Sequence, residues 1–101
     1  MEVYLSELAE SKLLKLSEYL LSEWNLKVRN EFIEKLKSKV EQISKQPKSC
    51  PESMEFKGLF KCVVTKQTTF YYRINSELNS IEIITLFDTR QNPKKLKKNL
   101  N

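Results

Sequence analysis

The chain has 101 residues, of which 31% are charged and 40% are hydrophobic, with one glycine and three prolines. These values predict one folded domain with a single core and exclude a disordered or linker-rich chain. No apolar run reaches the roughly 18 residues that a membrane span requires, and the acidic start at Glu2 does not resemble a signal peptide. We therefore expect one cytoplasmic domain, residues 1–101, whose residues 94–101 form a basic tail.

The net charge of +5 is unevenly placed, because four lysines and no acid follow Pro93. A basic end on a small domain favours an anionic partner, either nucleic acid or an acidic protein segment. The alternative is that this end of the chain is a solvated tail that binds no partner.

The chain has two cysteines and no histidine. A zinc site would have to recruit carboxylates, so we expect neither a metal nor a cofactor. Cys50 and Cys62 could be bridged on geometry, but a reducing cytosol disfavours a disulfide. We interpret Cys62 as a small core residue on a strand.

Residues 3–5 are expected to form a short edge strand closed by Ser6, which can cap a following helix. Apolar residues then recur at spacings of three and four, which predicts one buried stripe along that helix. The stripe comprises Ala9, Leu13, Leu16, Leu20 and Trp24, and it is widened by Leu14 and Leu21. We expect Trp24 to be a core anchor.

Asn25 is a plausible cap for a second helix, which should end near Lys45 because Pro47 follows. Its apolar stripe is Phe32, Leu36, Val40 and Ile43. The segment 46–55 is a loop by composition, and we assign it no chemistry.

The period changes to two after Gly58, which predicts strands near 60–65, 70–74 and 81–87. In the last strand, Ile81, Ile83, Thr85 and Phe87 should share one face, with Glu82, Ile84 and Leu86 on the other. Short connections between these strands imply an antiparallel meander. The predicted fold class is therefore α+β, a two-layer sandwich in the order β-α-α-β-β-β with an antiparallel sheet packed against a helical hairpin.

Arg90 follows this last strand, in a polar tip that Pro93 separates from any further sheet. A strand exit is a place where a rigid scaffold presents functional groups. Other cationic and phenolic side chains gather on the predicted strands and their ends. Together with Arg90 they are Lys57, Lys61, Lys66, Arg73, Tyr71 and Tyr72.

This set could bind phosphate, but metal-free RNA cleavage would also need a base and an acid. Without histidine, those roles would fall to a lysine of lowered pKa or to a tyrosine. The alternative is that Tyr71 and Tyr72 are ordinary sheet residues, one packed and one at the surface.

The layout, with the segments LFKCVVTK (59–66), FYYRI (70–74) and a last strand ending in TRQNP (89–93), resembles the RelE/ParE superfamily of toxins from type II toxin-antitoxin modules. The first helix, with Ala9 and Tyr19 followed by Trp24, is similar too. An arginine at the strand exit followed by a polar pair and proline looks most like the ParE branch, often labelled plasmid stabilization proteins.

The resemblance implies a growth-inhibiting toxin that is neutralised by a cognate antitoxin. ParE-type toxins poison DNA gyrase, whereas RelE-type toxins are ribosome-dependent endoribonucleases that cut mRNA. Lys61 and Arg90 match features of the ribonucleases, but no tyrosine or histidine follows Arg90, and Thr69 lies about where such enzymes often carry an arginine. We therefore favour the ParE interpretation, which is not enzymatic.

Two alternatives remain open: the ribonuclease, and a non-toxic remnant that only binds an antitoxin. In the ribonuclease, the expected catalytic set is Lys61, Arg73, Arg90 and Tyr71. The residues that we expect to contact the target are Arg90, Asn92, Pro93, Lys61 and Arg73. The expected partners are the antitoxin and DNA gyrase, or the ribosome and mRNA, with no membrane, and the chain could form a homodimer or a toxin-antitoxin hetero-oligomer.

Overall fold

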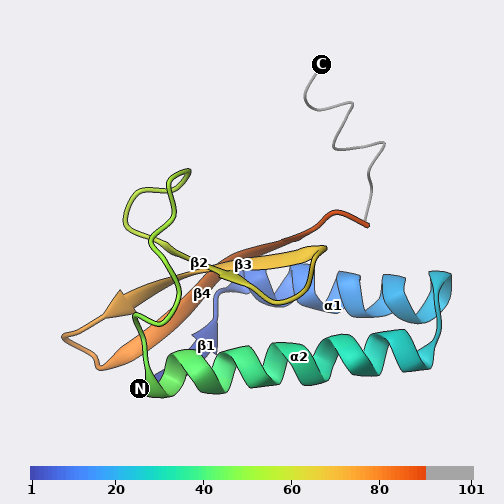
Figure 1. Cartoon of the computed structure of the whole chain (residues 1–101), viewed down its shortest axis with the longest axis horizontal. Helices are drawn as coiled ribbons and strands as arrows, with labels where there is room; N and C mark the ends of the chain where they lie inside the picture. The colour runs from blue at the N-terminus through green and yellow to red at the C-terminus, as the bar shows by residue number, and fades with distance from the viewer. Residues whose placement is uncertain (91–101) are drawn as a thin grey trace.

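Two long helices and a four-stranded sheet make up the computed structural model, which describes residues 1–90 (Figure 1). The elements in chain order are β1 (Glu2–Leu5), α1 (Glu7–Glu23), α2 (Leu26–Lys45), β2 (Phe60–Val63), β3 (Thr68–Asn75) and β4 (Ser80–Asp88). This is the predicted α+β order. Within residues 1–90, neither helix has the length and apolarity needed to cross a bilayer.

The strands lie in the order β1-β4-β3-β2. β2, β3 and β4 form the expected antiparallel meander, whereas β1 pairs with β4 in parallel, with Val3 beside Ile81. The sheet is therefore mixed, and the prediction of a wholly antiparallel sheet is wrong at this pair. Short connections fix the direction of consecutive strands, but β1 pairs with the strand farthest from it in the sequence.

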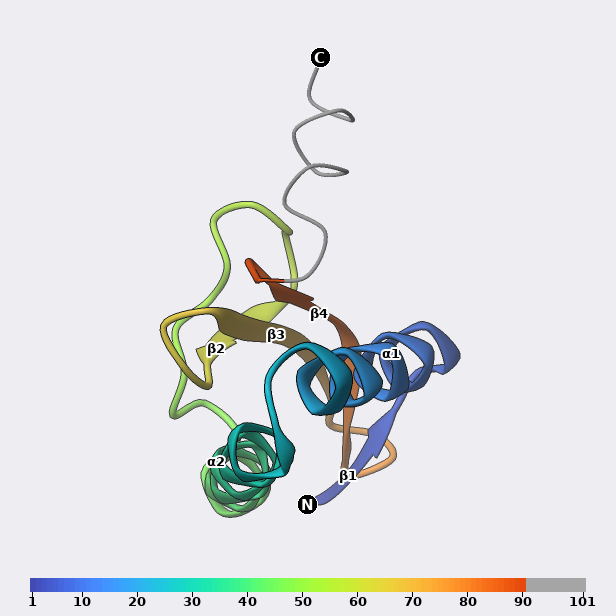
Figure 2. The ribbon, with the colours of Figure 1, turned by 90° about the vertical axis from the view of Figure 1, so that its right-hand side faces the viewer.

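Both helices cover the same face of the sheet, as expected for a hairpin with one apolar stripe on each helix (Figure 2). The predicted caps are present: Ser6 Oγ accepts from the Ala9 amide at 3.0 Å, and Asn25 Oδ1 accepts from the Val28 amide at 2.8 Å. α2 ends at Lys45, as predicted. Local sequence signals thus set the start of both helices and the end of α2.

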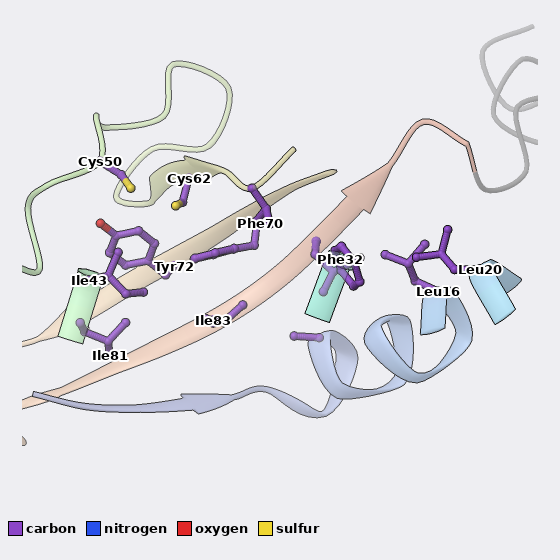
Figure 3. Packing of buried hydrophobic residues seen from close by; sticks show 13 residues of the cluster. Leu16, Leu20, Phe32, Ile43, Cys50, Cys62, Phe70, Tyr72, Ile81 and Ile83 are labelled. Atoms are coloured by element: carbon purple, nitrogen blue, oxygen red, sulfur yellow. The ribbon is translucent and has the colours of Figure 1, made fainter. Parts of the chain in front are cut away.

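The core lies between the helices and the sheet (Figure 3). Its largest fully buried side chains include Leu16, Leu20, Ile43, Phe70, Tyr72, Ile81 and Ile83. Leu13, Leu36 and Val40 are partly buried against it. Cys62 is a core residue on β2, as predicted.

Three residues of the first predicted stripe are not in the core. Trp24, Leu14 and Leu21 are 55%, 59% and 47% exposed. Each helical residue turns by roughly 100°, which places Leu14 and Leu21 well away from the Leu16 and Leu20 face. Trp24 is the C-cap of α1 with a non-helical backbone, so its side chain no longer continues the stripe.

A β-bulge at Ile84 changes which residues of β4 face the core. Tyr71 pairs with Thr85 and Tyr72 with Ile83, so Ile84 has no partner of its own on β3. Leu86 therefore joins Ile83 in the core, and the prediction that Ile81, Ile83, Thr85 and Phe87 share one face is wrong beyond the bulge. Alternation by two cannot show such an inserted residue in advance.

Candidate functional site

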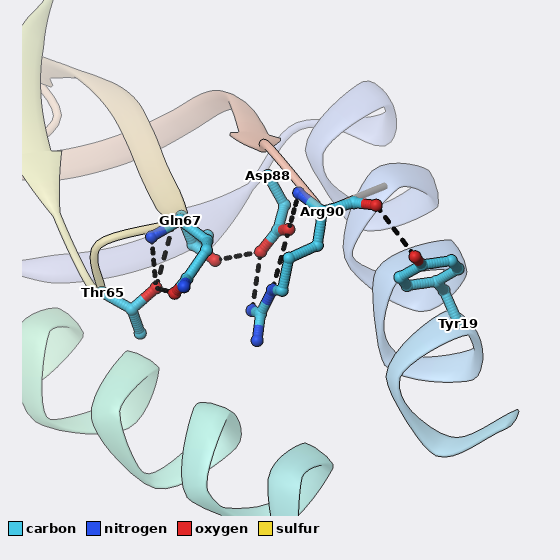
Figure 4. Close-up of polar contacts among 6 residues, drawn as sticks. Tyr19, Thr65, Gln67, Asp88 and Arg90 are labelled. Carbon is cyan, nitrogen blue, oxygen red and sulfur yellow. Dashed lines mark hydrogen bonds and ion pairs between the residues drawn. The ribbon is translucent and has the colours of Figure 1, made fainter. Parts of the chain in front are cut away.

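The exit of β4 is built around Arg90 and Asp88 (Figure 4). Arg90 Nε lies 3.1 Å from Asp88 Oδ1, and Nη2 lies 2.8 Å from Oδ2. The Arg90 amide also donates to Asp88 Oδ1 at 2.8 Å. This two-point pair fixes the plane of the guanidinium, and three of its five N–H donors are not used by Asp88.

Asp88 is the buried half of the pair, with a side chain that is 0% exposed against 18% for Arg90. Thr68 Oγ1 at the start of β3 donates to Asp88 Oδ2. Burial alone would raise the pKa of Asp88, but the hydrogen bonds from Arg90 and Thr68 outweigh it and hold the pKa below its usual value. Asp88 is thus a charged anchor that orients Arg90.

Neighbouring elements hold the strand exit in place. The hydroxyl of Tyr19 in α1 donates to the Arg90 carbonyl at 2.8 Å, and the Thr89 amide donates to the Gln67 carbonyl at 3.0 Å. Thr65 Oγ1 in turn accepts from the Gln67 amide and closes the turn between β2 and β3. The position of Arg90 is therefore set by α1, β3 and this turn together.

A second polar group lies on the sheet face opposite the helices. Tyr71 donates to Glu55 Oε2 at 2.6 Å, and Lys61 Nζ lies 3.3 Å from Glu55 Oε1. Phe56 packs edge-on against the Tyr71 ring, with ring centroids 4.9 Å apart. The 46–59 loop therefore covers Tyr71 and supplies an acid to two of the predicted site residues.

These contacts change two pKa values. Burial and the hydrogen bond to Glu55 raise the pKa of Tyr71 to about 12. The hydrogen bonds from Tyr71 and Lys61 lower the pKa of Glu55. Tyr71 is thus held protonated and Glu55 ionised at neutral pH.

The four residues of the predicted catalytic set fall into three separate groups. Lys61 and Tyr71 share Glu55, and Arg90 pairs with Asp88. Arg73 Nη2 lies 2.7 Å from Glu82 Oε1 on the adjacent strand. The structure therefore brings Lys61 and Tyr71 together but does not gather all four around one centre.

Other residues singled out from the sequence either differ from expectation or lie outside the described part of the chain. One of Tyr71 and Tyr72 is expected to be packed and the other to lie at the surface, but both are buried, at 5% and 0% exposure. Asn92, Pro93 and the tail, residues 94–101, lie outside the described residues. Lys57 and Lys66 are exposed.

Sequence reasoning missed Glu55, Phe56 and Lys12. Lys12 Nζ in α1 lies 3.9 Å from the centroid of the Phe87 ring, a cation-π contact on the same face as Tyr71. Apart from the contact between Glu55 and Lys61, these contacts have no local signal, since each joins a helix or loop to a distant strand. Within residues 1–90, no cluster of three or more potential metal ligands is present.

Comparison with solved structures defines the class of fold as that of toxins from toxin-antitoxin pairs. The chromosomal ParDE system of P. aeruginosa matches with a TM-score of 0.72 at 10% identity, covering 87% of this chain and 95% of that chain. The YoeB/ParE toxin of Agrobacterium tumefaciens matches with a TM-score of 0.63 at 14% identity, covering 87% and 98%. The intact E. coli RelBE toxin-antitoxin complex matches with a TM-score of 0.60 at 15% identity, covering 86% and 94%.

A family model narrows this class. Residues 3–93 match the ParE toxin of the type II toxin-antitoxin system, parDE, and the chain belongs to this family. The protein is thus the toxin of a type II toxin-antitoxin pair, and its partner is an antitoxin. No curated protein sequence matches the chain.

Proposed function

We propose that this toxin inhibits DNA gyrase in the cytoplasm, with Arg90 as the central contact residue. The observation that carries the proposal is the Arg90 and Asp88 pair at the strand exit. A guanidinium fixed by a buried carboxylate loses little further freedom on binding, and its remaining donors are arranged in a rigid fork. Such a group suits recognition of an acidic or planar surface on a protein target.

The raised pKa of Tyr71 and the ion pairs of the other site residues favour a binding role over RNA cleavage. A ribonuclease would need a group that gives and takes a proton near neutral pH. Tyr71 is unsuited to this, because its pKa is raised to about 12 and its proton is engaged by Glu55. Lys61 and Arg73 are also paired with acids.

One observation favours the ribonuclease as a second candidate. Lys61 and Tyr71 converge on the two oxygens of a single carboxylate, and a phosphate could replace Glu55 between them. In that case Glu55 would compete with the RNA. Glu55→Gln would then increase ribosome-dependent mRNA cleavage, whereas it would leave gyrase inhibition unchanged.

We further propose that the antitoxin is an acidic, partly disordered segment that folds over the helical hairpin and the sheet. An apolar groove of about 440 Å³ lies between α2 and β1, lined by residues that include Val3, Leu5, Leu36 and Val40. Exposed apolar side chains on α1, among them Leu14 and Leu21, offer further anchors. The net charge of +5 favours an acidic segment, and the toxin-antitoxin hetero-oligomer is the expected assembly, with a toxin homodimer as the alternative.

The test uses purified toxin with purified DNA gyrase and a relaxed plasmid. Loss of supercoiling and accumulation of cleaved plasmid are expected, and adding the antitoxin should reverse both. The same preparation is added to a translating ribosome system, where intact mRNA is expected. Cleaved mRNA with normal supercoiling would overturn the gyrase proposal, and normal growth of cells that make the soluble protein would identify a non-toxic remnant.

A further inference from the structure

The 46–59 loop runs beside β2 as a short antiparallel segment. Glu52 forms a bridge with Phe60, the Lys61 amide donates to the Pro51 carbonyl at 2.8 Å, and the Ser53 amide donates to the Leu59 carbonyl at 2.7 Å. In this antiparallel register, each step back along the loop is matched by one step forward along β2. Continued by one residue, this register places Cys50 opposite Cys62.

The type of this pair follows from the hydrogen bonds around it. Pro51 with Lys61, and Ser53 with Leu59, are the pairs that share backbone hydrogen bonds. Opposed pairs alternate along an antiparallel ladder, so Cys50 with Cys62 is a pair without such bonds. The Cα atoms of such pairs lie about 4.5 Å apart, within the roughly 4.4 to 6.8 Å range of disulfides.

The positions of the two side chains agree with this pairing. Both cysteines are reduced and buried, at 7% and 1% exposure, and Figure 3 shows their sulfur atoms next to each other above Tyr72. Burial and the neighbouring Cys50 raise the pKa of the Cys62 thiol to about 12. The two thiols therefore lie near each other in the core.

We propose that Cys50 and Cys62 form a reversible intramolecular disulfide when the protein meets a low-molecular-weight disulfide such as oxidised glutathione. Cys50 lies on the loop and is the more exposed thiol, so its thiolate attacks first. This step breaks the glutathione S–S bond, forms a mixed disulfide and releases one reduced glutathione. Cys62 then loses its proton and attacks the Cys50 sulfur, which releases a second reduced glutathione. Two protein thiols are oxidised and one disulfide molecule is reduced.

The bond would close a ring that contains Glu55 and Phe56, the residues that cover Lys61 and Tyr71. Oxidation would therefore hold the 46–59 loop shut over this part of the sheet. Formation of this disulfide does not depend on which target the toxin has, because it involves the two thiols and the loop alone.

The first experiment incubates the purified full chain with oxidised glutathione and counts thiols by intact mass. The wild type should lose two hydrogen atoms and carry no glutathione, whereas Cys62→Ala should retain one glutathione on Cys50. Dithiothreitol should restore both thiols. A wild type that retains glutathione to the same extent as Cys62→Ala, keeps both thiols, or forms linked dimers would overturn the proposal. Cys50→Ser is the parallel variant on the loop, should Cys62→Ala fail to fold.

The second experiment compares the oxidised and reduced wild type. Closing a short loop should raise the Tm by roughly 5 °C or more, and amide hydrogen exchange in residues 50–60 should slow at least tenfold. The turn after β3 should exchange at the same rate in both forms and serves as the internal control. Equal exchange in residues 50–60, or a lower Tm after oxidation, would show that the bond does not hold the loop.

Discussion

The hydroxyl of Tyr19 lies 2.8 Å from the carbonyl oxygen of Arg90, so α1 holds the residue at which β4 leaves the sheet. The backbone of Arg90 is fixed by this bond, while its side chain is fixed separately by Asp88. A residue held at both ends presents its guanidinium in one orientation. This relationship makes Arg90 the first residue to test.

Arg90→Lys should sharply reduce toxicity while keeping the fold. Lysine retains the positive charge beside Asp88 but lacks the planar fork that contacts the carboxylate at two points. Growth of induced cells and gyrase supercoiling in vitro measure the effect, and antitoxin binding should be nearly unchanged. Arg29→Lys is the matched control, because Arg29 lies on α2, is only partly buried and bonds through its Nε to the side chain of the neighbouring Asn30.

The stability of the Arg90 variants separates function from folding. Arg90→Ala leaves the buried Asp88 carboxylate unpaired, which should cost about 1 to 3 kcal/mol or more, whereas Arg90→Lys should cost less. Full toxicity of Arg90→Lys, or loss of toxicity only through unfolding, would contradict the assignment. Lys98→Ala tests the basic tail in the same assays and should have little effect.

Leu16→Ala should lower the free energy of unfolding by about 2 to 5 kcal/mol, since it opens a cavity where the side chain is fully buried. Leu14→Ala removes the same atoms from the same helix at a position that is 59% exposed, and it should change stability by less than about 0.5 kcal/mol. Urea denaturation of both variants measures the difference. Equal midpoints for the two would show that the core face of α1 is wrongly placed.

The starts of both helices, the end of α2 and most of the core could be predicted because their signals are local. Ser6 and Asn25 act as caps through an amide three residues on, and the α2 stripe follows from a spacing within one helix. Trp24 does not follow the predicted stripe because the helix ends at that residue. The helix end changes the direction of the side chain, although the spacing continues.

The remaining features depend on contacts between segments far apart in the chain. The parallel pairing of β1 and the bulge at Ile84 are set by partners about 80 residues away and on a neighbouring strand. Ser6 illustrates this, because its hydroxyl also donates to the Ile84 carbonyl at 2.7 Å. In the candidate site, Arg90 could be placed at a strand exit, but its pairing with Asp88 and the Glu55 cover over Tyr71 required the folded arrangement.

Association with the antitoxin should slow as salt rises from low to physiological concentration. The toxin carries a net charge of +5, so an acidic partner is attracted over a distance that salt shortens. Dissociation should change less, because buried apolar contacts determine it. Stopped-flow measurement of both rates provides the check, and an association rate indifferent to ionic strength would contradict an electrostatic encounter.

The pair at the strand exit should make the protein sensitive to acid. The folded-state pKa of Asp88 is lowered, so its contribution to stability is present above the unfolded value near pH 4 and is lost as the pH falls through the folded value. Thr68→Val removes one hydrogen bond to the carboxylate, so the variant should lose stability at a higher pH than the wild type. Melting temperatures of both proteins, measured between about pH 5 and pH 2, test this expectation. Overlapping profiles would mean that the Thr68 hydrogen bond does not lower the pKa of Asp88.

Tyr71 should produce the opposite dependence at alkaline pH. Its folded-state pKa is raised from 10.0 to about 12, so the proton is bound more tightly in the folded protein than in the unfolded chain. The stabilisation is therefore fully present below about pH 10 and is lost as the pH rises through about 12. Tyr71→Phe cannot ionise, so its stability relative to the wild type should improve over this range. Tyr4→Phe is the matched control, because Tyr4 is 44% exposed on the edge strand and should follow the wild-type profile. Parallel profiles for Tyr71→Phe and the wild type would mean that the 46–59 loop does not cover Tyr71 in solution.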